Sequence, residues 1–142
     1  MHGRVLFART HRWCRKPTSW VDLGYNVVTN LGLAQVIRMH GTGLAIYPIN
    51  RMQFGSGGAT EDETDETLQM PIAPIKNLSL VEAVDSRTVA MEAYLDTTEG
   101  NGFPLSEVGL LSVDGVLMAR KTFTAQSKTS DYLFHFRWIV GF

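Results

Sequence analysis

Apolar and polar residues alternate along most of the second half of the chain, which is the pattern of strands with one buried face. The clearest run is 132–142, where one face carries Tyr132, Phe134, Phe136, Trp138, Val140 and Phe142. Two hairpins are predicted, 78–84 with 88–95 and 107–113 with 116–123, the second around Asp114-Gly115, a strong turn signal. Short strands separated by turns predict a mainly β fold, an antiparallel β-sandwich or barrel.

One stretch has helical periodicity instead. Thr29-Asn30 supplies an N-cap, and the apolar stripe that follows consists of Leu31, Leu33, Ala34, Val36 and Ile37. We expect one short amphipathic α-helix of roughly ten residues, with its stripe covering one side of a sheet.

The length of 142 residues fits one domain. Residues 1–24 differ in character from the rest, because five basic residues precede the first acid, Asp22, and strand character is limited to Val5–Phe7. We therefore predict a basic, extended N-terminal arm over 1–24 and a single β-sandwich domain over 25–142.

A net charge of −1 conceals a separation of charge, since five acids also occupy the six positions 61–66, here called the acidic loop. Such a run repels itself and is solvated unless a partner neutralises it. One interpretation is that the arm and the loop are independent surface features. The other is that they contact each other, mainly between neighbouring subunits, where opposite charges determine how the two subunits align. The predicted contact residues are Arg4, Arg9, Arg12, Trp13, Arg15, Lys16 and Trp20 in the arm, and Glu61, Asp62, Glu63, Asp65 and Glu66 in the loop.

Motifs for catalysis, metals and cofactors are missing from the sequence. The single cysteine, Cys14, excludes an intrachain disulfide and a Cys-rich zinc site. The histidines lack metal-ligand spacing, and the acidic loop lacks the spacing of an EF-hand. The glycine run 55–58 lacks the Gly-Lys-Ser/Thr ending of a phosphate loop. We expect no cofactor, no membrane span and, from the near-neutral charge, no nucleic-acid partner.

Three segments in order resemble small virion structural proteins of tailed bacteriophages, of the neck, collar, baseplate or tail-fibre-attachment type. They are Asn26–Leu33, then Met52–Gly58 with Thr67-Leu68, and then Ser106–Leu111 with Gly115–Phe123. The last pair is similar to a hairpin of the form N-E-(A/I)-G-L-(F/Y) … G-x-L-(L/I)-A-R-x-x-F. The resemblance extends over residues 25–142 and implies a β-rich structural part of the virion, not an enzyme.

The expected function is therefore that of a non-enzymatic virion protein, made in the host cytoplasm. We expect it to form a homo-oligomer and to dock onto other virion proteins, of the portal or neck, tail, baseplate or fibre. Because no fibre-like or coiled-coil region follows Phe142 in this sequence, a compact fitting is expected.

Other functions stay open. A receptor- or carbohydrate-binding module requires at least one of Trp13, Trp20 and Tyr94 to face solvent in a groove; a capsid decoration protein is a further alternative. A hydrolase would need Glu107 to pair with another acid, but a charged residue at the start of a strand more often binds backbone N–H groups or an adjacent arginine.

Overall fold

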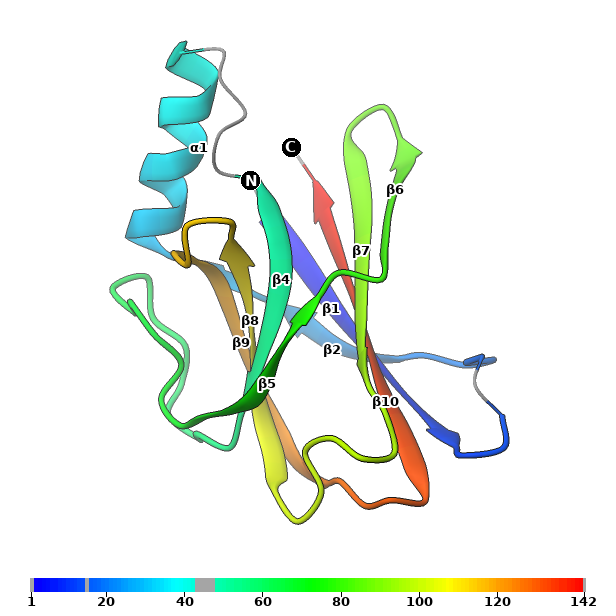
Figure 1. Cartoon of the computed structure of the whole chain (residues 1–142). Coiled ribbons are helices and arrows are strands. Elements are labelled where there is room, and N and C mark those ends of the chain that lie inside the picture. Colours follow the sequence, from blue (N-terminus) through cyan, green and yellow to red (C-terminus); the bar gives the residue numbers. More distant parts are fainter. Residues whose placement is uncertain (1, 15, 43–47, 142) are drawn as a thin grey trace.

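The protein is a β-sandwich with one helix at its edge (Figure 1). The computed structural model describes residues 2–14, 16–42 and 48–141. Two five-stranded antiparallel sheets have the strand orders β2-β1-β10-β7-β6 (sheet A) and β3-β9-β8-β4-β5 (sheet B). The elements are β1 His2–His11, β2 Val21–Tyr25, β3 Val27–Val28, α1 Asn30–Thr42, β4 Ile49–Gly55, β5 Pro71–Asn77, β6 Leu80–Asp85, β7 Thr88–Leu95, β8 Pro104–Ser112, β9 Leu117–Ser127 and β10 Tyr132–Gly141. The predicted fold class is confirmed, in its sandwich form rather than as a closed barrel.

The core lies between the sheets and is built on the alternation of β10. Phe134, Phe136 and Trp138 are fully buried there, as predicted for one face of this strand. The Phe136 ring lies 5.0 Å from that of Phe54 on sheet B, and the Phe134 ring packs edge-on against Phe7 at 5.1 Å. Aromatic pairs in these geometries add stability beyond the area they bury.

Both predicted hairpins are present, as β6–β7 and β8–β9. The second turns at Asp114-Gly115, where Gly115 has a φ of 85° and its N–H donates to the Ser112 carbonyl at 2.9 Å. A positive φ favours glycine, which explains the turn signal in the sequence.

The predicted extended arm is wrong for residues 2–11, which form β1, an interior strand of sheet A, and for residues 21–24, which belong to β2 at the edge of the same sheet. β1 pairs with β10 over its whole length, from His2–Gly141 to His11–Tyr132, and with β2 on its other edge. Val5 and Phe7 enter the core. The basic residues suggested a solvated arm, but the two in this strand, Arg4 and Arg9, are exposed beside buried neighbours. Pairing with β10 along the whole strand and with β2 over Arg4–Phe7 satisfies much of the backbone.

Sequence analysis also missed β5. This strand contains Pro71 and Pro74, which argue against a strand, but it is at the edge of sheet B and pairs only with β4. Proline lacks an N–H group, so an edge strand tolerates it where a central strand does not.

The helix forms as predicted but does not cover a sheet face with its stripe. Thr29 caps it, accepting the Gly32 N–H on Oγ1 at 2.9 Å. Gly32 lies so close to β9 that a Cβ there would be 2.3 Å from the Met118 carbonyl oxygen, so the first turn is pressed onto the sheet. Beyond it, α1 extends past the strands (Figure 1), and Leu33 and Ile37 are exposed.

We predict that Phe7→Ala lowers the free energy of unfolding by about 3–5 kcal/mol, because it empties a position in the core. Arg9→Ala on the same strand should cost less than about 1 kcal/mol, since it removes only an exposed contact with the Tyr132 ring. Urea denaturation of both variants measures the difference. Equal, small effects would mean that residues 2–11 behave as a loose arm.

Candidate functional site

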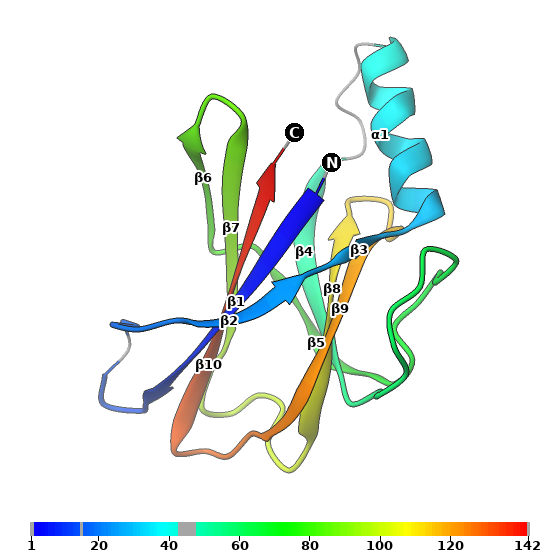
Figure 2. The ribbon, with the colours of Figure 1, turned by 180° about the vertical axis from the view of Figure 1, so that it is seen from behind.

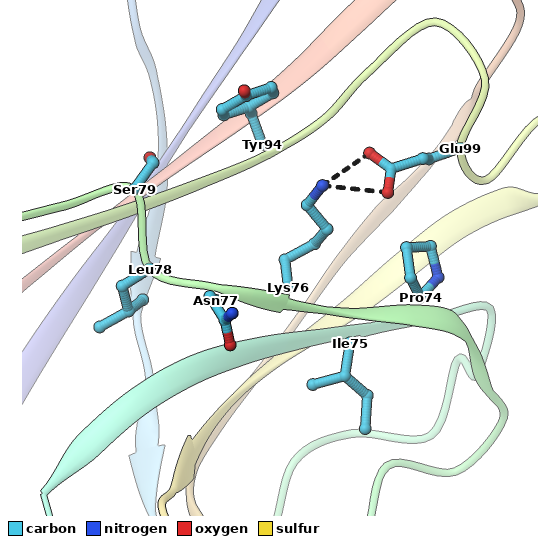
Figure 3. Close-up of a pocket in the computed structure, with 8 residues that line it drawn as sticks. All are labelled: Pro74, Ile75, Lys76, Asn77, Leu78, Ser79, Tyr94 and Glu99. Atoms are coloured by element: carbon cyan, nitrogen blue, oxygen red, sulfur yellow. Dashed lines mark hydrogen bonds and ion pairs between the residues drawn. The ribbon is translucent and has the colours of Figure 1, made fainter.

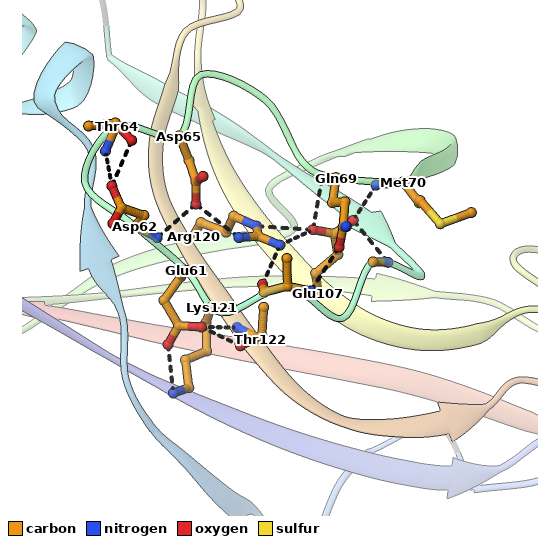
Figure 4. Close-up of polar contacts among 12 residues, drawn as sticks. Glu61, Asp62, Thr64, Asp65, Gln69, Met70, Glu107, Arg120, Lys121 and Thr122 are labelled. Carbon is orange, nitrogen blue, oxygen red and sulfur yellow. Dashed lines mark hydrogen bonds and ion pairs between the residues drawn. The ribbon is translucent and has the colours of Figure 1, made fainter.

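A buried ion pair between neighbouring strands supports the acidic loop (Figure 4). Glu107 on β8 is fully buried and Arg120 on β9 is 2% exposed. Arg120 donates through Nε and Nη2 to Glu107 Oε2, at 3.0 and 2.8 Å. Charges removed from water in this way are tolerated only where further hydrogen bonds complete their shells.

Backbone groups complete the shell of the Glu107 carboxylate. It accepts the N–H groups of Gly57, Gln69 and Met70 at 3.1, 3.0 and 2.7 Å, from both ends of the connection between β4 and β5. The expectation that Glu107 binds backbone N–H groups or an adjacent arginine is confirmed. Both carboxylate oxygens are therefore occupied within the fold, which removes the acid on which a hydrolase was considered.

Two glycines let the connection approach this carboxylate. A Cβ added at Gly55 or Gly57 would lie 2.4 or 2.6 Å from Glu107 Oε1, whereas a Cβ at Gly58 would meet nothing within 4 Å. The glycine run in the sequence is thus explained by close packing on a buried ion, rather than by a bound phosphate.

The acidic loop is held by β9 through two of its five acids. Arg120 Nη1 reaches Asp65 Oδ2 at 2.9 Å, and Lys121 Nζ reaches Glu61 Oε1 at 3.1 Å. Glu61 also accepts hydrogen bonds from the N–H and hydroxyl groups of Thr122. Burial raises the pKa of Glu61, but the Thr122 and Lys121 interactions outweigh it, so this pKa lies below its ordinary value. Burial likewise opposes the charge on Arg120, and its acidic partners outweigh it and raise its pKa.

The other three acids of the loop face solvent. Asp62, Glu63 and Glu66 are exposed, and none of them forms an ion pair within the described part of the chain. The Glu63 carbonyl accepts the Asn30 N–H at 2.7 Å, which joins the loop to the start of α1. The result is a fixed loop with three outward carboxylates beside the exposed helix.

The predicted arm residues have mostly local partners. Arg4 pairs with Asp22 and lies over Tyr25; Arg9 lies over Tyr132. Arg12 is 3.9 Å from Asp131 and stacks on Trp13. Lys16 is exposed, and Arg15 lies outside the described residues. Among residues 2–14, 16–42 and 48–141, no ion pair joins these cations to the acidic loop, so contact between them within one chain is not observed.

The predicted aromatic contacts lie on the outer face of sheet A. Trp20 is half-buried, with its ring 6.4 Å from that of His135. Trp13 is 78% exposed and, with Tyr94, lines a hollow of about 730 Å³. A second hollow of about 400 Å³ lies on the other side, where Figure 3 shows Lys76 held by Glu99 below Tyr94.

The cations that neutralise the acidic loop, Arg120 and Lys121, were not among the predicted contact residues. Their position in the sequence offered one signal, because Arg120 belongs to the hairpin motif of the resemblance, together with Glu107. The pairing register of β8 and β9 explains why the two charged residues meet. Gly109 lies opposite Arg120 and Glu107 lies opposite Thr122, so the side chains of Glu107 and Arg120 are diagonal neighbours on the same face of the sheet.

We predict that Gly57→Ala lowers the free energy of unfolding by about 1–3 kcal/mol, the usual cost of overpacking, because the new methyl group would overlap Gln69 Cβ and Glu107 Oε1, at 2.5 and 2.6 Å. Gly58→Ala is the matched control and should change stability by no more than about 0.5 kcal/mol. Thermal or urea denaturation compares them. Equal effects would contradict the tight packing of this connection on the carboxylate.

Comparison with known families gives one match. Residues 24–133 match the family model described as phage tail-collar fibre protein, N-terminal, which covers more than half of the chain. No curated protein and no solved structure matches significantly. In the described residues, no cluster of His, Cys, Asp and Glu is arranged to hold a metal ion, and the helix is too short to cross a bilayer.

Proposed function

This chain belongs to the phage tail-collar fibre proteins, through their N-terminal region, and we propose that it is a non-enzymatic fitting that self-associates and docks onto another tail component. Its membership makes it a structural protein of the phage tail and a component of the virion. The observation that carries the proposal is the fixed acidic loop with three solvent-facing carboxylates.

Self-association is supported by the placement of charge. The loop between β4 and β5 and the segment that follows β1 lie on opposite sides of the domain in both views (Figures 1 and 2). Lys16 in this segment and Arg9 near the end of β1 are exposed, and neither forms an ion pair with the acidic loop of its own chain among the described residues. A neighbouring copy brings the two regions together in a head-to-tail contact, which closes into a ring if the rotation allows. Such a contact accounts for a homo-oligomer.

A charge exchange tests this contact. Glu63→Lys with Glu66→Lys should lower the oligomer mass, measured by light scattering at low salt, because like charges then meet. Adding Arg9→Glu and Lys16→Glu to the same chain should restore the mass, since each contact regains opposite charges. For the unmodified chain, 1 M salt should lower the mass, because it shortens the Debye length to about 3 Å.

The control is Glu82→Lys with Asp85→Lys, which makes the same change in charge on β6 and also removes the ion pair of Glu82 with Arg137. It should leave the oligomer mass unchanged. A chain that is monomeric at low salt would contradict self-association, and a loop variant that keeps the full mass would contradict this contact.

We propose that the exposed side of α1 is the surface that docks onto a different tail component. Leu33 and Ile37 are 45% and 63% exposed, although the helix is anchored at its first turn and by Gln35, whose Nε2 donates to Asp114 at 2.8 Å. An exposed apolar stripe on an ordered helix favours burial in the groove of another protein. The neighbouring carboxylates favour a partner groove rimmed by basic residues.

We expect Leu33→Ser with Ile37→Ser to abolish binding of the purified protein to phage particles produced without it, measured by co-sedimentation. Val81→Ser with Val84→Ser is the control, because it removes two apolar residues of comparable exposure, 60% and 53%, from β6. The control should bind like the unmodified protein. Equal binding by both variants would contradict docking through α1.

A further inference from the structure

A buried amine lies against a side-chain amide where β9 ends, and we propose that Lys128 and Asn101 join there in an isopeptide bond, an amide between two side chains. The bond links the connection between β7 and β8 to the connection between β9 and β10. This site is separate from the surfaces of the proposed function, since it contains neither the acidic loop nor α1.

Lys128 supplies the reactive amine. It is 1% exposed, and its Nζ lies 5.9 Å from the centre of the fully buried Phe134 ring. Within the described part of the chain, Lys128 forms no ion pair. Burial of a cation without a paired carboxylate favours its neutral form, and it lowers the pKa of Lys128 below the ordinary value. A neutral lysine amine in an apolar site is a nucleophile.

The amide of Asn101 is held beside this amine. Lys128 Nζ donates to Asn101 Oδ1 at 2.9 Å and to the Thr129 carbonyl at 3.0 Å. The amide nitrogen of Asn101 donates to the Thr97 carbonyl at 2.8 Å, so both ends of the amide are held. The amide carbon is one bond from Oδ1, which puts it no more than about 4 Å from Nζ. Groups held at this separation need only a small movement to reach attack distance.

Backbone hydrogen bonds hold the two connections together. They lie at the same end of the sandwich in both views (Figures 1 and 2). The Gly102 N–H donates to the Lys128 carbonyl at 3.0 Å, and the Lys128 N–H donates to the Phe103 carbonyl at 3.3 Å. The amine and the amide are therefore brought together by paired backbone rather than by two independent loops.

The reaction needs no further reactant. The lone pair of the neutral amine attacks the amide carbon of Asn101, so that a bond forms between Lys128 Nζ and this carbon. The bond between the carbon and Asn101 Nδ2 then breaks. One proton passes from Nζ to Nδ2, which leaves as ammonia, and no atom is oxidised or reduced.

We assign the transfer of this proton to Asp96. The charges of Asp96 and Glu99 oppose the effect of burial on the pKa of Lys128, and that of Asp96 does so more strongly. Glu99 binds Lys76 through both carboxylate oxygens, at 2.8 and 3.0 Å. The Thr98 N–H and hydroxyl groups both donate to Asp96 Oδ1, so its Oδ2 is the oxygen assigned to carry the proton.

The bond closes the open end of the β8–β9 hairpin, whose other end is the turn at Asp114-Gly115. Residues 101–128 then form a covalent ring that includes both strands of the buried ion pair. A crosslink of this kind stabilises a fold mainly by restricting the unfolded chain. It also holds the ends of the two strands together under load, which suits a part of a phage tail.

Mass spectrometry of the full chain tests the bond. We expect an intact mass below that of the sequence by one ammonia molecule. Trypsin cuts after arginine and lysine but not after an acylated lysine, so its digest should contain peptide 88–120 joined to peptide 122–137. Because a ring stays compact when denatured, the chain should also migrate faster in a denaturing gel than a chain without the bond.

Variants separate the bond from a merely structural role of the lysine. Lys128→Arg and Asn101→Ala should each lose the mass shift and the joined peptide, and Asn101 is exposed, so its variant should still fold. Lys121→Arg is the matched control and should keep both. Asp96→Asn keeps an acceptor for Thr98 and should slow formation of the bond by at least about a hundredfold, the lower end of acid–base catalysis.

Two results would overturn the proposal. One is an intact mass equal to that of the sequence, with no joined peptide. The other is a gain in mass at Asn101 from exchange of its amino group for a hydroxyl group, which would mean that the amide is lost by hydrolysis. An unchanged rate in Asp96→Asn would overturn the role of Asp96. The oligomer mass plays no part in these readouts, so the bond and self-association can fail independently.

Discussion

The buried pair of Glu107 and Arg120 is the interaction on which the loops of sheet B depend. Two charges with almost no exposure are costly, and five hydrogen bonds to Glu107 offset that cost. Three of these bonds come from the connection between β4 and β5, so its path follows from the position of one carboxylate. Arg120 then extends the network outward to Asp65 and to the Ala59 carbonyl.

This network divides the acids of the loop into two groups. Glu61 and Asp65 are used inside the chain, where they neutralise cations of β9. The three other acids are exposed on a loop held to β9 and to the start of α1 by hydrogen bonds, next to a helix with an exposed stripe. A charged surface that is already ordered loses less entropy when a partner binds, which suits a structural protein of a phage tail.

The outer face of sheet A carries a hollow that is separate from the loops of sheet B. The segment after β1 brings Trp13 to the outer face of the sheet, opposite the end of β7 that carries Tyr94. A receptor- or carbohydrate-binding module required a solvent-facing aromatic side chain in a groove, and Trp13 and Tyr94 meet that requirement. Trp20 does not, because it packs beside His135.

Much of the fold was predictable from local patterns. The alternation in β10, the Asp-Gly turn and the Thr29 cap each depend on neighbours within a few residues, and all three were identified. Only Val5–Phe7 of β1 was predicted as a strand, and β5 was missed, because charges in one and prolines in the other oppose the average preferences of strands. Both segments form strands because of their positions in the sheets. β1 has a neighbouring strand on each edge, and β5 lies at the edge of sheet B, where a missing N–H group is tolerated.

The sequence by itself determined the fold class, the two hairpins, the helix and the kinship with phage tail proteins, because periodicity, turn chemistry and ordered motifs are local properties of the chain. It also indicated that Glu107 would bind an arginine or backbone N–H groups. Only the tertiary structure decided that this arginine is Arg120, which acids of the loop form ion pairs with β9, and that Trp13 and Tyr94 line the same hollow. Each of these depends on register between strands and on packing between segments far apart in the sequence, where a shift of one residue would turn every side chain to the opposite face.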